Sequence, residues 1–171
     1  MNAIKIWLLV LAGTLALILV GADLVLHVCP PHDPPNYNLV EKGLYMGGRE
    51  PAPPPGTRAV LNLCEVKDEY EVDVQRWSAI KDAPPAPGIN WLREQVDFID
   101  QQRQAGRPTY VHCHAGVSRA ALVITAYEMR RHGWTRDQAL EFVRSKRSVI
   151  NPNPAFRELL LEWEEFIKHR P

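Results

Sequence analysis

The sequence predicts an α/β fold with a central, mostly parallel sheet flanked by helices, preceded by an N-terminal hydrophobic helix. Two observations predict the domain: short β-branched, apolar runs alternate with segments of helical periodicity, and glycine and proline clusters separate them. A third predicts the extra helix, because the amino-terminal run is apolar on every face. We therefore expect an anchor or signal segment over residues 1–28, a proline-rich linker over 29–37 and one domain over 38–171.

The hydrophobic segment comes first. Residues 6–22 read IWLLVLAGTLALILVGA without a charge, between Lys5 and Asp23. Because about 20 apolar residues cross a bilayer, we expect a single-pass transmembrane anchor and a membrane location. The small residues at 20–22 also fit the cleavage site of a secretory signal, so a secreted protein is the alternative. The orientation in the membrane is not predicted.

The next elements are a spacer and three strands. Residues 29–36, CPPHDPPN, form a stiff proline-rich spacer. Beyond it we expect short strands at GLYMGG (43–48), RAVLNL (58–63) and TYVH (109–112). The last of them leads directly into a loop that holds a cysteine.

Four helices are expected around these strands, and each begins or ends at a residue suited to that position. One of them lies between the second and the third of these strands, one follows the third strand, and two complete the chain. The signals are Asn90 before a helix from Trp91, Gly133 after a helix over 118–131, a capping box of Thr135 and Gln138, and Asn153 followed by Pro154 at the start of the last helix.

Composition excludes several kinds of function. Acidic and basic residues number 20 each, so the net charge is zero and we expect no nucleic-acid partner, which normally requires a basic excess. The cysteines, Cys29, Cys64 and Cys113, are few, odd in number and far apart, which fits neither a disulfide framework nor a zinc site. We expect neither a metal nor an organic cofactor, so the chemistry must come from side chains.

The run HCHAGVSR, residues 112–119, is the candidate site. A loop that enters a helix collects free backbone N–H groups, which bind an oxyanion, and Gly116 lets the backbone turn them inward. Arg119 adds a planar fork for two phosphate oxygens, and the same positive field favours the thiolate of Cys113. The pattern therefore predicts phosphate capture followed by thiolate attack, whereas Cys64, after an apolar run, is expected in the core.

This loop resembles the Cys-x5-Arg active-site loop of the protein tyrosine phosphatase superfamily, specifically of its dual-specificity branch. Residues 43–48 resemble the family's opening strand, and Asn153-Pro-Ala-Phe156 resembles its Asn-x-x-Phe element behind the active site. The likeness covers roughly residues 38–168. It implies a dual-specificity phosphatase-like fold and hydrolysis of phosphate monoesters through a phosphocysteine, without a cofactor.

The resemblance also implies a general acid, an aspartate on a mobile loop about thirty residues before the nucleophile. Asp82 fits, since it lies 31 positions before Cys113 in a proline-rich loop. Its acidic rivals, Asp68, Glu69 and Asp73, lie farther upstream, and we expect them on a solvated helical face.

Other site residues follow from the same resemblance. His112 matches the family histidine that orders the loop, and Asn153 the residue that supports the site. The expected phosphate-binding residues are His114, Ala115, Gly116, Val117, Ser118 and Arg119.

One position departs from the family pattern. The family usually has Ser or Thr directly after the loop arginine, where its hydroxyl helps the thiolate to leave the phosphocysteine. This chain has Ala120 there, with Ser118 nearby. We therefore expect slow hydrolysis of the phosphoenzyme.

The substrate is predicted less sharply. The loop lacks the lysines with which relatives meet inositol phospholipids, so a phosphoprotein, dephosphorylated at tyrosine and at serine or threonine, is the expected partner besides the membrane. One alternative is a membrane-lipid phosphate, either phosphatidylglycerophosphate or a phosphoinositide. Another is a phosphate-binding module without turnover, which Ala120 would favour, and a third is sulfur transfer by a rhodanese-like loop.

Overall fold

The computed structural model describes residues 34–169, and the residues from Asn36 onward form one compact unit. Strands and helices alternate in the described part, as the sequence pattern predicts. The strands are β1 (Tyr37–Glu41), β2 (Leu44–Gly47), β3 (Ala59–Asn62), β4 (Val74–Trp77) and β5 (Thr109–His112), and the helices are α2 (Ile89–Gln104), α3 (Arg119–His132), α4 (Arg136–Lys146) and α5 (Pro154–Lys168).

The sheet has the order β1-β2-β5-β3-β4. β1 pairs with β2 antiparallel, and the other three pairings are parallel. The sheet is therefore mixed, with mostly parallel pairings as predicted. In register, Gly47 of β2 and Asn62 of β3 both lie beside His112 of β5. The carboxyl ends of three parallel strands therefore meet where the cysteine loop begins, which is the edge where open α/β sheets bind ligands.

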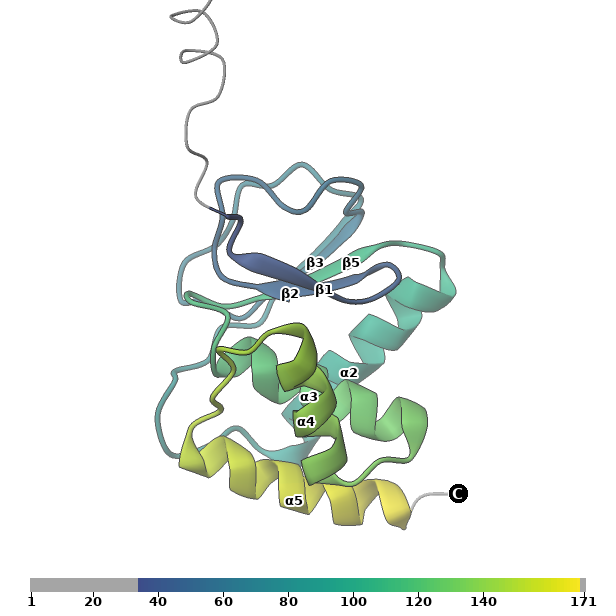
Figure 1. Ribbon diagram of the computed structural model, residues 1–171. Coiled ribbons are helices and arrows are strands. Elements are labelled where there is room, and N and C mark those ends of the chain that lie inside the picture. The colour runs from purple at the N-terminus through teal and green to yellow at the C-terminus, as the bar shows by residue number, and fades with distance from the viewer. Residues whose placement is uncertain (1–33, 170–171) are drawn as a thin grey trace, which may run out of the picture. The chain divides into compact units, whose positions relative to one another are not determined.

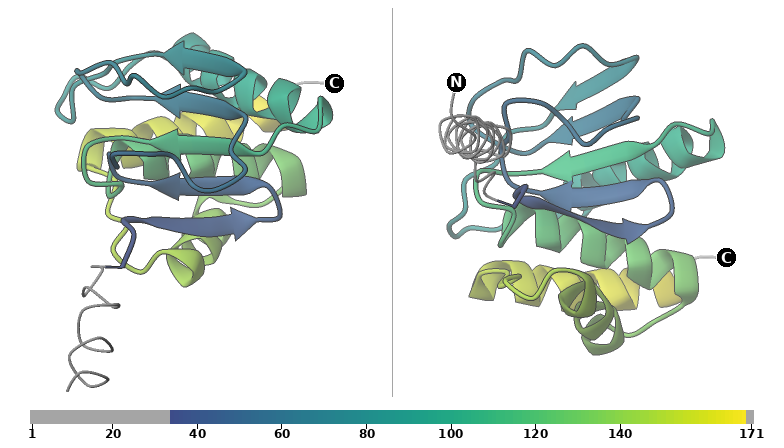
Figure 2. Two further views of the ribbon diagram at one scale, coloured as in Figure 1. Left: turned by 90° about the horizontal axis from the view of Figure 1, so that it is seen from above. Right: turned by 45° about the horizontal axis from the view of Figure 1, so that its top comes forward.

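Helices cover one side of this sheet. Figures 1 and 2 show α2, α3, α4 and α5 together on that side, while the connections from β2 to β3 and from β3 to β4 pass over the other. α3 lies at the centre, since it contacts β2, β5 and each of the other three helices. All its residues from Arg119 to Met129 are buried, and Trp163 of α5 donates a hydrogen bond to its Ala126 carbonyl at 2.9 Å.

Local signals placed most elements correctly. The three predicted strands are β2, β3 and β5, and Gly133 ends α3 with φ 65°. The capping box at Thr135 and the Asn153 cap are both present. Asn90 as a helix cap is wrong, because α2 already starts at Ile89, after Gly88.

The edges of the sheet were not predicted. β1 and β4 have mostly half-buried or exposed side chains, so neither contains the continuous apolar run that marks a buried strand. The solvated helix expected around Asp68 is also wrong. Residues 63–73 form a connection without a helix, and Asp68 is buried in it, 5% exposed.

The predicted membrane location is contradicted. Within residues 34–169 no helix combines the length and the apolar character that crossing a bilayer requires. The predicted hydrophobic helix, residues 6–22, lies outside the described residues, as does most of the linker. We therefore correct the prediction of a single-pass membrane protein.

Candidate active site

The loop from Cys113 to Ser118 joins β5 to α3 and packs directly on the end of β2. The Cys113 N–H donates to the Gly47 carbonyl at 3.2 Å, and the Arg49 N–H donates to the His114 carbonyl at 2.9 Å. Gly116 has φ 67°, and a Cβ on it would collide with the backbone of Gly47. Only glycine fits both the left-handed conformation and this close approach, which explains the residue in the middle of the loop.

Arg119, at the start of α3, is held by one of its terminal nitrogens. Nη1 donates to the carbonyls of Leu63 and Ile80, at 3.3 and 3.1 Å, and to Glu65 Oε2 at 2.6 Å. The hydrogen bond from Arg119 lowers the pKa of Glu65. Arg119 Nε, in contrast, is buried and has no hydrogen-bond partner. A buried donor without a hydrogen bond is costly, so the side chain is fixed with Nε left to bind a ligand.

Asp82 lies against the carboxyl end of this loop. Its Oδ1 accepts hydrogen bonds from Ser118 Oγ at 2.6 Å and from Asn153 Nδ2 at 2.8 Å. Its Oδ2 is 4.0 Å from Arg119 Nε. The Asn153 N–H in turn donates to Ser118 Oγ at 3.1 Å. Four predicted site residues from three distant segments therefore lie together.

His112, the last residue of β5, is fully buried next to Cys113. Its Nε2 is 2.7 Å from Asp68 Oδ2, and its ring stacks on Tyr110 with the centroids 5.0 Å apart. Burial lowers the pKa of His112, and Asp68 opposes this effect only in part. A neutral ring can donate from Nε2 to Asp68 Oδ2. Asp68 Oδ1 is buried without a hydrogen bond, 3.6 Å from Arg49 Nε. This pair fixes the end of β5.

Cys113 is 2% exposed, and Cys64 is buried nearby with its sulfur 3.9 Å from His112 Nδ1. Burial, followed by the neighbouring Cys113, raises the pKa of Cys64 to about 12, so Cys64 stays a thiol. Ala120 is fully buried. The hydroxyl of Ser118 donates to Asp82. Within residues 34–169, no hydroxyl forms a hydrogen bond with the sulfur of Cys113.

Three charged residues at the site escaped sequence reasoning. Asp68, expected on a solvated helical face, is buried against His112. Glu65 is exposed, and it accepts a hydrogen bond from Arg119. Arg147 closely follows two other basic residues at the end of α4, yet it is buried and donates to the carbonyls of Ala115 and Gly116. No local signal distinguishes these residues, because each partner lies at least 31 positions away in the sequence.

One cluster has the donor set of a cation site. Ligand atoms of Glu41, Glu128 and His132 lie within 4.8 Å of one another. However, Arg103 and Arg131 approach Glu41 Oε2 at 3.1 and 3.3 Å. Two guanidinium groups already balance the carboxylates, so the cluster is a poor fit for a metal ion.

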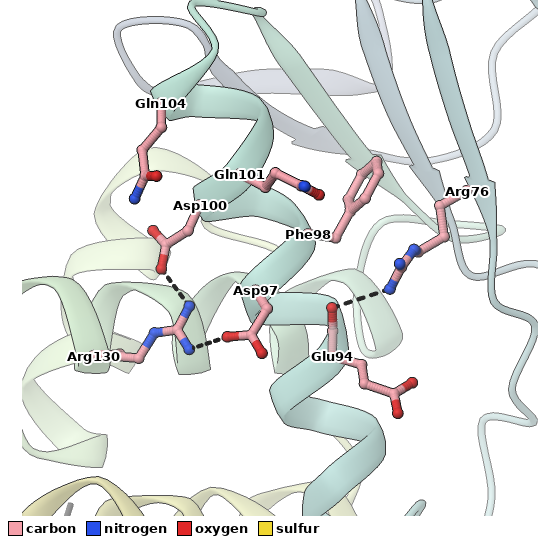
Figure 3. Close-up of a pocket in the computed structure, with 8 residues that line it drawn as sticks. All are labelled: Arg76, Glu94, Asp97, Phe98, Asp100, Gln101, Gln104 and Arg130. Atoms are coloured by element: carbon pink, nitrogen blue, oxygen red, sulfur yellow. Dashed lines mark hydrogen bonds and ion pairs between the residues drawn. The ribbon is translucent and has the colours of Figure 1, made fainter.

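A groove of about 590 Å³ runs along α2, and none of its lining residues belongs to the cysteine loop (Figure 3). Both of its arginines have hydrogen-bond partners. Arg130 of α3 reaches Asp97 at 2.5 Å and also Asp100, and Arg76 donates to the Glu94 carbonyl at 3.1 Å. The groove offers no unpartnered group comparable to Arg119 Nε.

The sequence profile described as the dual specificity phosphatase catalytic domain matches residues 56–166. The chain belongs to the dual specificity phosphatase family. Dual specificity protein phosphatase 1 of Homo sapiens is 42% identical over 111 residues, which make up 64% of this chain and 30% of that protein. Dual specificity protein phosphatase 1 of Arabidopsis thaliana is 32% identical over 139 residues, 75% of this chain and 69% of that protein.

The family's fold is found in solved structures as well. The structure of human DUSP28 superposes with a TM-score of 0.70 at 25% identity, covering 80% of this chain and 97% of that one. The resemblance read from the cysteine loop is thereby confirmed. The chain spans about 30% of the length of the human relative.

Proposed function

We propose that this chain hydrolyses phosphate monoesters of proteins through a phosphocysteine intermediate. Cys113 is the nucleophile, Arg119 holds the phosphoryl oxygens and Asp82 is the general acid and base. The observation that carries the proposal is the buried Arg119 Nε at the start of α3, which has no hydrogen bond and lies 4.0 Å from Asp82 Oδ2. A phosphoryl oxygen bound there would satisfy this donor beside a carboxyl group that can transfer a proton.

The first step forms the S–P bond. The Cys113 thiolate attacks phosphorus, the P–O ester bond breaks, and the leaving alkoxide or phenoxide takes a proton from Asp82. Since Oδ1 of Asp82 already accepts two hydrogen bonds, Oδ2 is the oxygen that carries this proton. The second step reverses the roles. Water gives a proton to the Asp82 carboxylate and attacks phosphorus, the S–P bond breaks, and phosphate leaves with the thiolate regenerated.

A groove beside the loop supports a phosphopeptide substrate. It has a volume of about 740 Å³ and is formed by the β2–β3 and β3–β4 connections. The backbone of Arg49, in its wall, is bonded to His114 of the loop. The groove presents charges of both signs, Arg49 and Lys67 against Glu50 and Glu69. Such a surface suits the polar residues that flank a phosphorylated side chain. No observation favours lipid phosphates comparably.

The experiment measures phosphate release by the purified full chain from phosphotyrosine and phosphoserine peptides and from aryl phosphates. Cys113→Ser should abolish release from all of them. Asp82→Asn should lower kcat by roughly 10²- to 10⁴-fold for phosphoserine, a poor leaving group, and far less for an activated aryl phosphate. Asp73→Asn, an exposed carboxylate paired with Arg58, is the matched control and should leave kcat unchanged.

Three results would contradict the proposal. An equal loss with both leaving groups would remove Asp82 as the acid. Hydrolysis of phosphatidylglycerophosphate or phosphoinositides but not of peptides would change the substrate class. A folded chain that binds phosphate without turnover would be a binding module.

A further inference from the structure

Arg147 follows α4 and is 7% exposed, an unusual position for an arginine without a carboxylate partner. Its Nε donates to the Gly116 carbonyl at 2.8 Å, and one terminal nitrogen donates to the Ala115 carbonyl at 2.9 Å. Its remaining donors reach the side-chain oxygens of Asn38, at 2.8 Å, and of Asn36. One guanidinium therefore connects two successive carbonyls of the phosphate loop to the β1 region.

The carbonyls on either side of these two are also occupied. The His114 carbonyl accepts from the Arg49 N–H at 2.9 Å, and the Val117 carbonyl accepts from the Asn151 N–H at 2.8 Å. Four successive carbonyls of the loop thus have donors outside it. The outer two are held by backbone, and the middle two by the side chain of Arg147 alone.

Because the peptide unit is rigid, the hydrogen bonds to these carbonyls also determine where the loop N–H groups point. A trans peptide is planar, with its N–H opposite to its C=O. Fixing the Ala115 and Gly116 carbonyls on Arg147 therefore turns the N–H groups of Gly116 and Val117 away from Arg147, toward the inner side of the loop. We propose that Arg147 is a positioning residue that orients these two amides toward the phosphate, an inference that rests on the proposed function of the loop.

The charge of Arg147 supports the same role. All four of its acceptors are neutral oxygens, and burial lowers its pKa. A buried cation without a carboxylate partner is unfavourable by itself. Its charge interacts with Cys113, so a thiolate and a bound phosphate in the loop would both balance it.

An arginine is required by this geometry. Two carbonyls of successive peptides and two amide oxygens must be met by one side chain, which suits the rigid fork of a guanidinium and not the single ammonium of lysine. On the far side the fork is itself fixed, since Asn36 accepts from the Gly48 N–H at 2.8 Å and donates its own N–H to Glu50. The orientation of the amides is therefore set from outside the loop.

The test compares Arg147→Met and Arg147→Lys with Arg130→Met in the full chain. Arg130 is a suitable control because it also joins two elements through its guanidinium, bridging α3 to Asp97 and Asp100 of α2 away from the loop (Figure 3). Two quantities are measured: the dissociation constant of inorganic phosphate, by NMR titration, and the chemical shifts of the Gly116 and Val117 amides.

Arg147→Met should weaken phosphate binding about 10-fold or more and displace both amide resonances. For comparison, removing one oriented donor from an oxyanion hole lowers kcat by roughly 10²- to 10³-fold. Arg147→Lys should recover only part of the affinity, and Arg130→Met should change neither quantity. If Arg147→Met does not fold, the lysine variant decides alone. Wild-type affinity in Arg147→Lys would overturn the role of the fork.

Unchanged phosphate affinity and amide shifts in Arg147→Met, with only its melting temperature lowered, would also overturn the inference and leave a purely structural residue. The titration does not need turnover. A wild-type chain that binds phosphate through Gly116 and Val117 but hydrolyses nothing would therefore refute the proposed function and not this role of Arg147.

Discussion

The two ends of α3 bury charge in opposite ways. At its amino end, Arg119, Arg147 and the Asp68–His112 pair are buried, and each makes hydrogen bonds to a defined partner. At its carboxyl end, Glu128 is fully buried, yet neither of its carboxylate oxygens has a hydrogen bond. His132 Nε2 lies 3.2 Å from one of them, and the carboxylate of Glu41 is also close.

Titration responds differently at the two ends. The hydrogen bond from Arg119 lowers the pKa of Glu65, whereas burial, and next the neighbouring Glu41, raises the pKa of Glu128 to about 8. An exposed carboxylate beside a guanidinium thus keeps its charge, whereas a buried carboxylate without a hydrogen bond is neutralised. The groups that face Glu128 are Glu41 of β1, Arg103 of α2, and Arg131 and His132 of α3.

The strongest way to break the comparison is Arg119→Lys, which keeps the charge and removes the fork. We expect kcat/KM for an aryl phosphate to fall by about 10³-fold or more, because a single ammonium cannot hold two phosphoryl oxygens while bonding Leu63, Ile80 and Glu65. Steady-state kinetics measure this. A loss below 10-fold would mean that charge alone suffices at this end.

Asp68→Asn tests the paired carboxylate. Asparagine keeps an acceptor for His112 Nε2 but removes the charge that strengthens this hydrogen bond, so the free energy of unfolding should fall by about 1–3 kcal/mol. Asp73→Asn is the control: its ion pair with Arg58 is largely exposed, and we expect a change below about 1 kcal/mol. Urea denaturation at pH 7 measures both. Equal effects of the two substitutions would show that burial does not distinguish these carboxylates.

Glu128→Gln tests the carboxylate without a hydrogen bond, and this substitution is expected to raise the free energy of unfolding instead of lowering it. Between the ordinary pKa of 4.5 and the raised value of about 8, the folded state keeps a proton that the unfolded state has lost, so stability falls as the pH rises through this range. Glutamine has no such proton to lose. The variant should therefore gain about 1–3 kcal/mol at pH 8 and almost nothing at pH 4.5.

Urea denaturation from pH 4.5 to pH 8.5 measures this, with Glu162→Gln, exposed on α5, as the control that keeps the wild-type slope. Parallel pH profiles for wild type and Glu128→Gln would contradict the raised pKa.

Ala120→Ser is the smallest expected change and concerns the second chemical step. A hydroxyl beside the sulfur of Cys113 should help the thiolate to leave, raising kcat for an aryl phosphate by about 2- to 10-fold. In wild type, slow phosphoenzyme hydrolysis predicts a pre-steady-state burst, which the substitution should diminish. Stopped-flow measurements decide. Fast hydrolysis of the wild-type intermediate without a burst would refute the effect assigned to Ala120.

The sequence by itself determined the features that local signals encode. A β-branched run, a glycine-containing loop and a helix start follow one another in the sequence. This order is sufficient to predict β5, the Cys113–Arg119 loop and α3, because such a loop binds phosphate through residues that are adjacent in the sequence. Capping residues likewise predicted where α4 and α5 begin. The family spacing predicted Asp82, which lies against Ser118 and Arg119.

Only the tertiary structure decided which charges complete the site. Asp68 and Arg147 look like surface residues in the sequence although both are buried, and the edge strands β1 and β4 contain no continuous apolar run. Their environment depends on contacts between distant segments: Arg147 meets Asn36 and Asn38 more than 100 positions away. A charged side chain is buried when such partners satisfy its hydrogen bonds, and the pattern of its sequence neighbours contains no record of those partners.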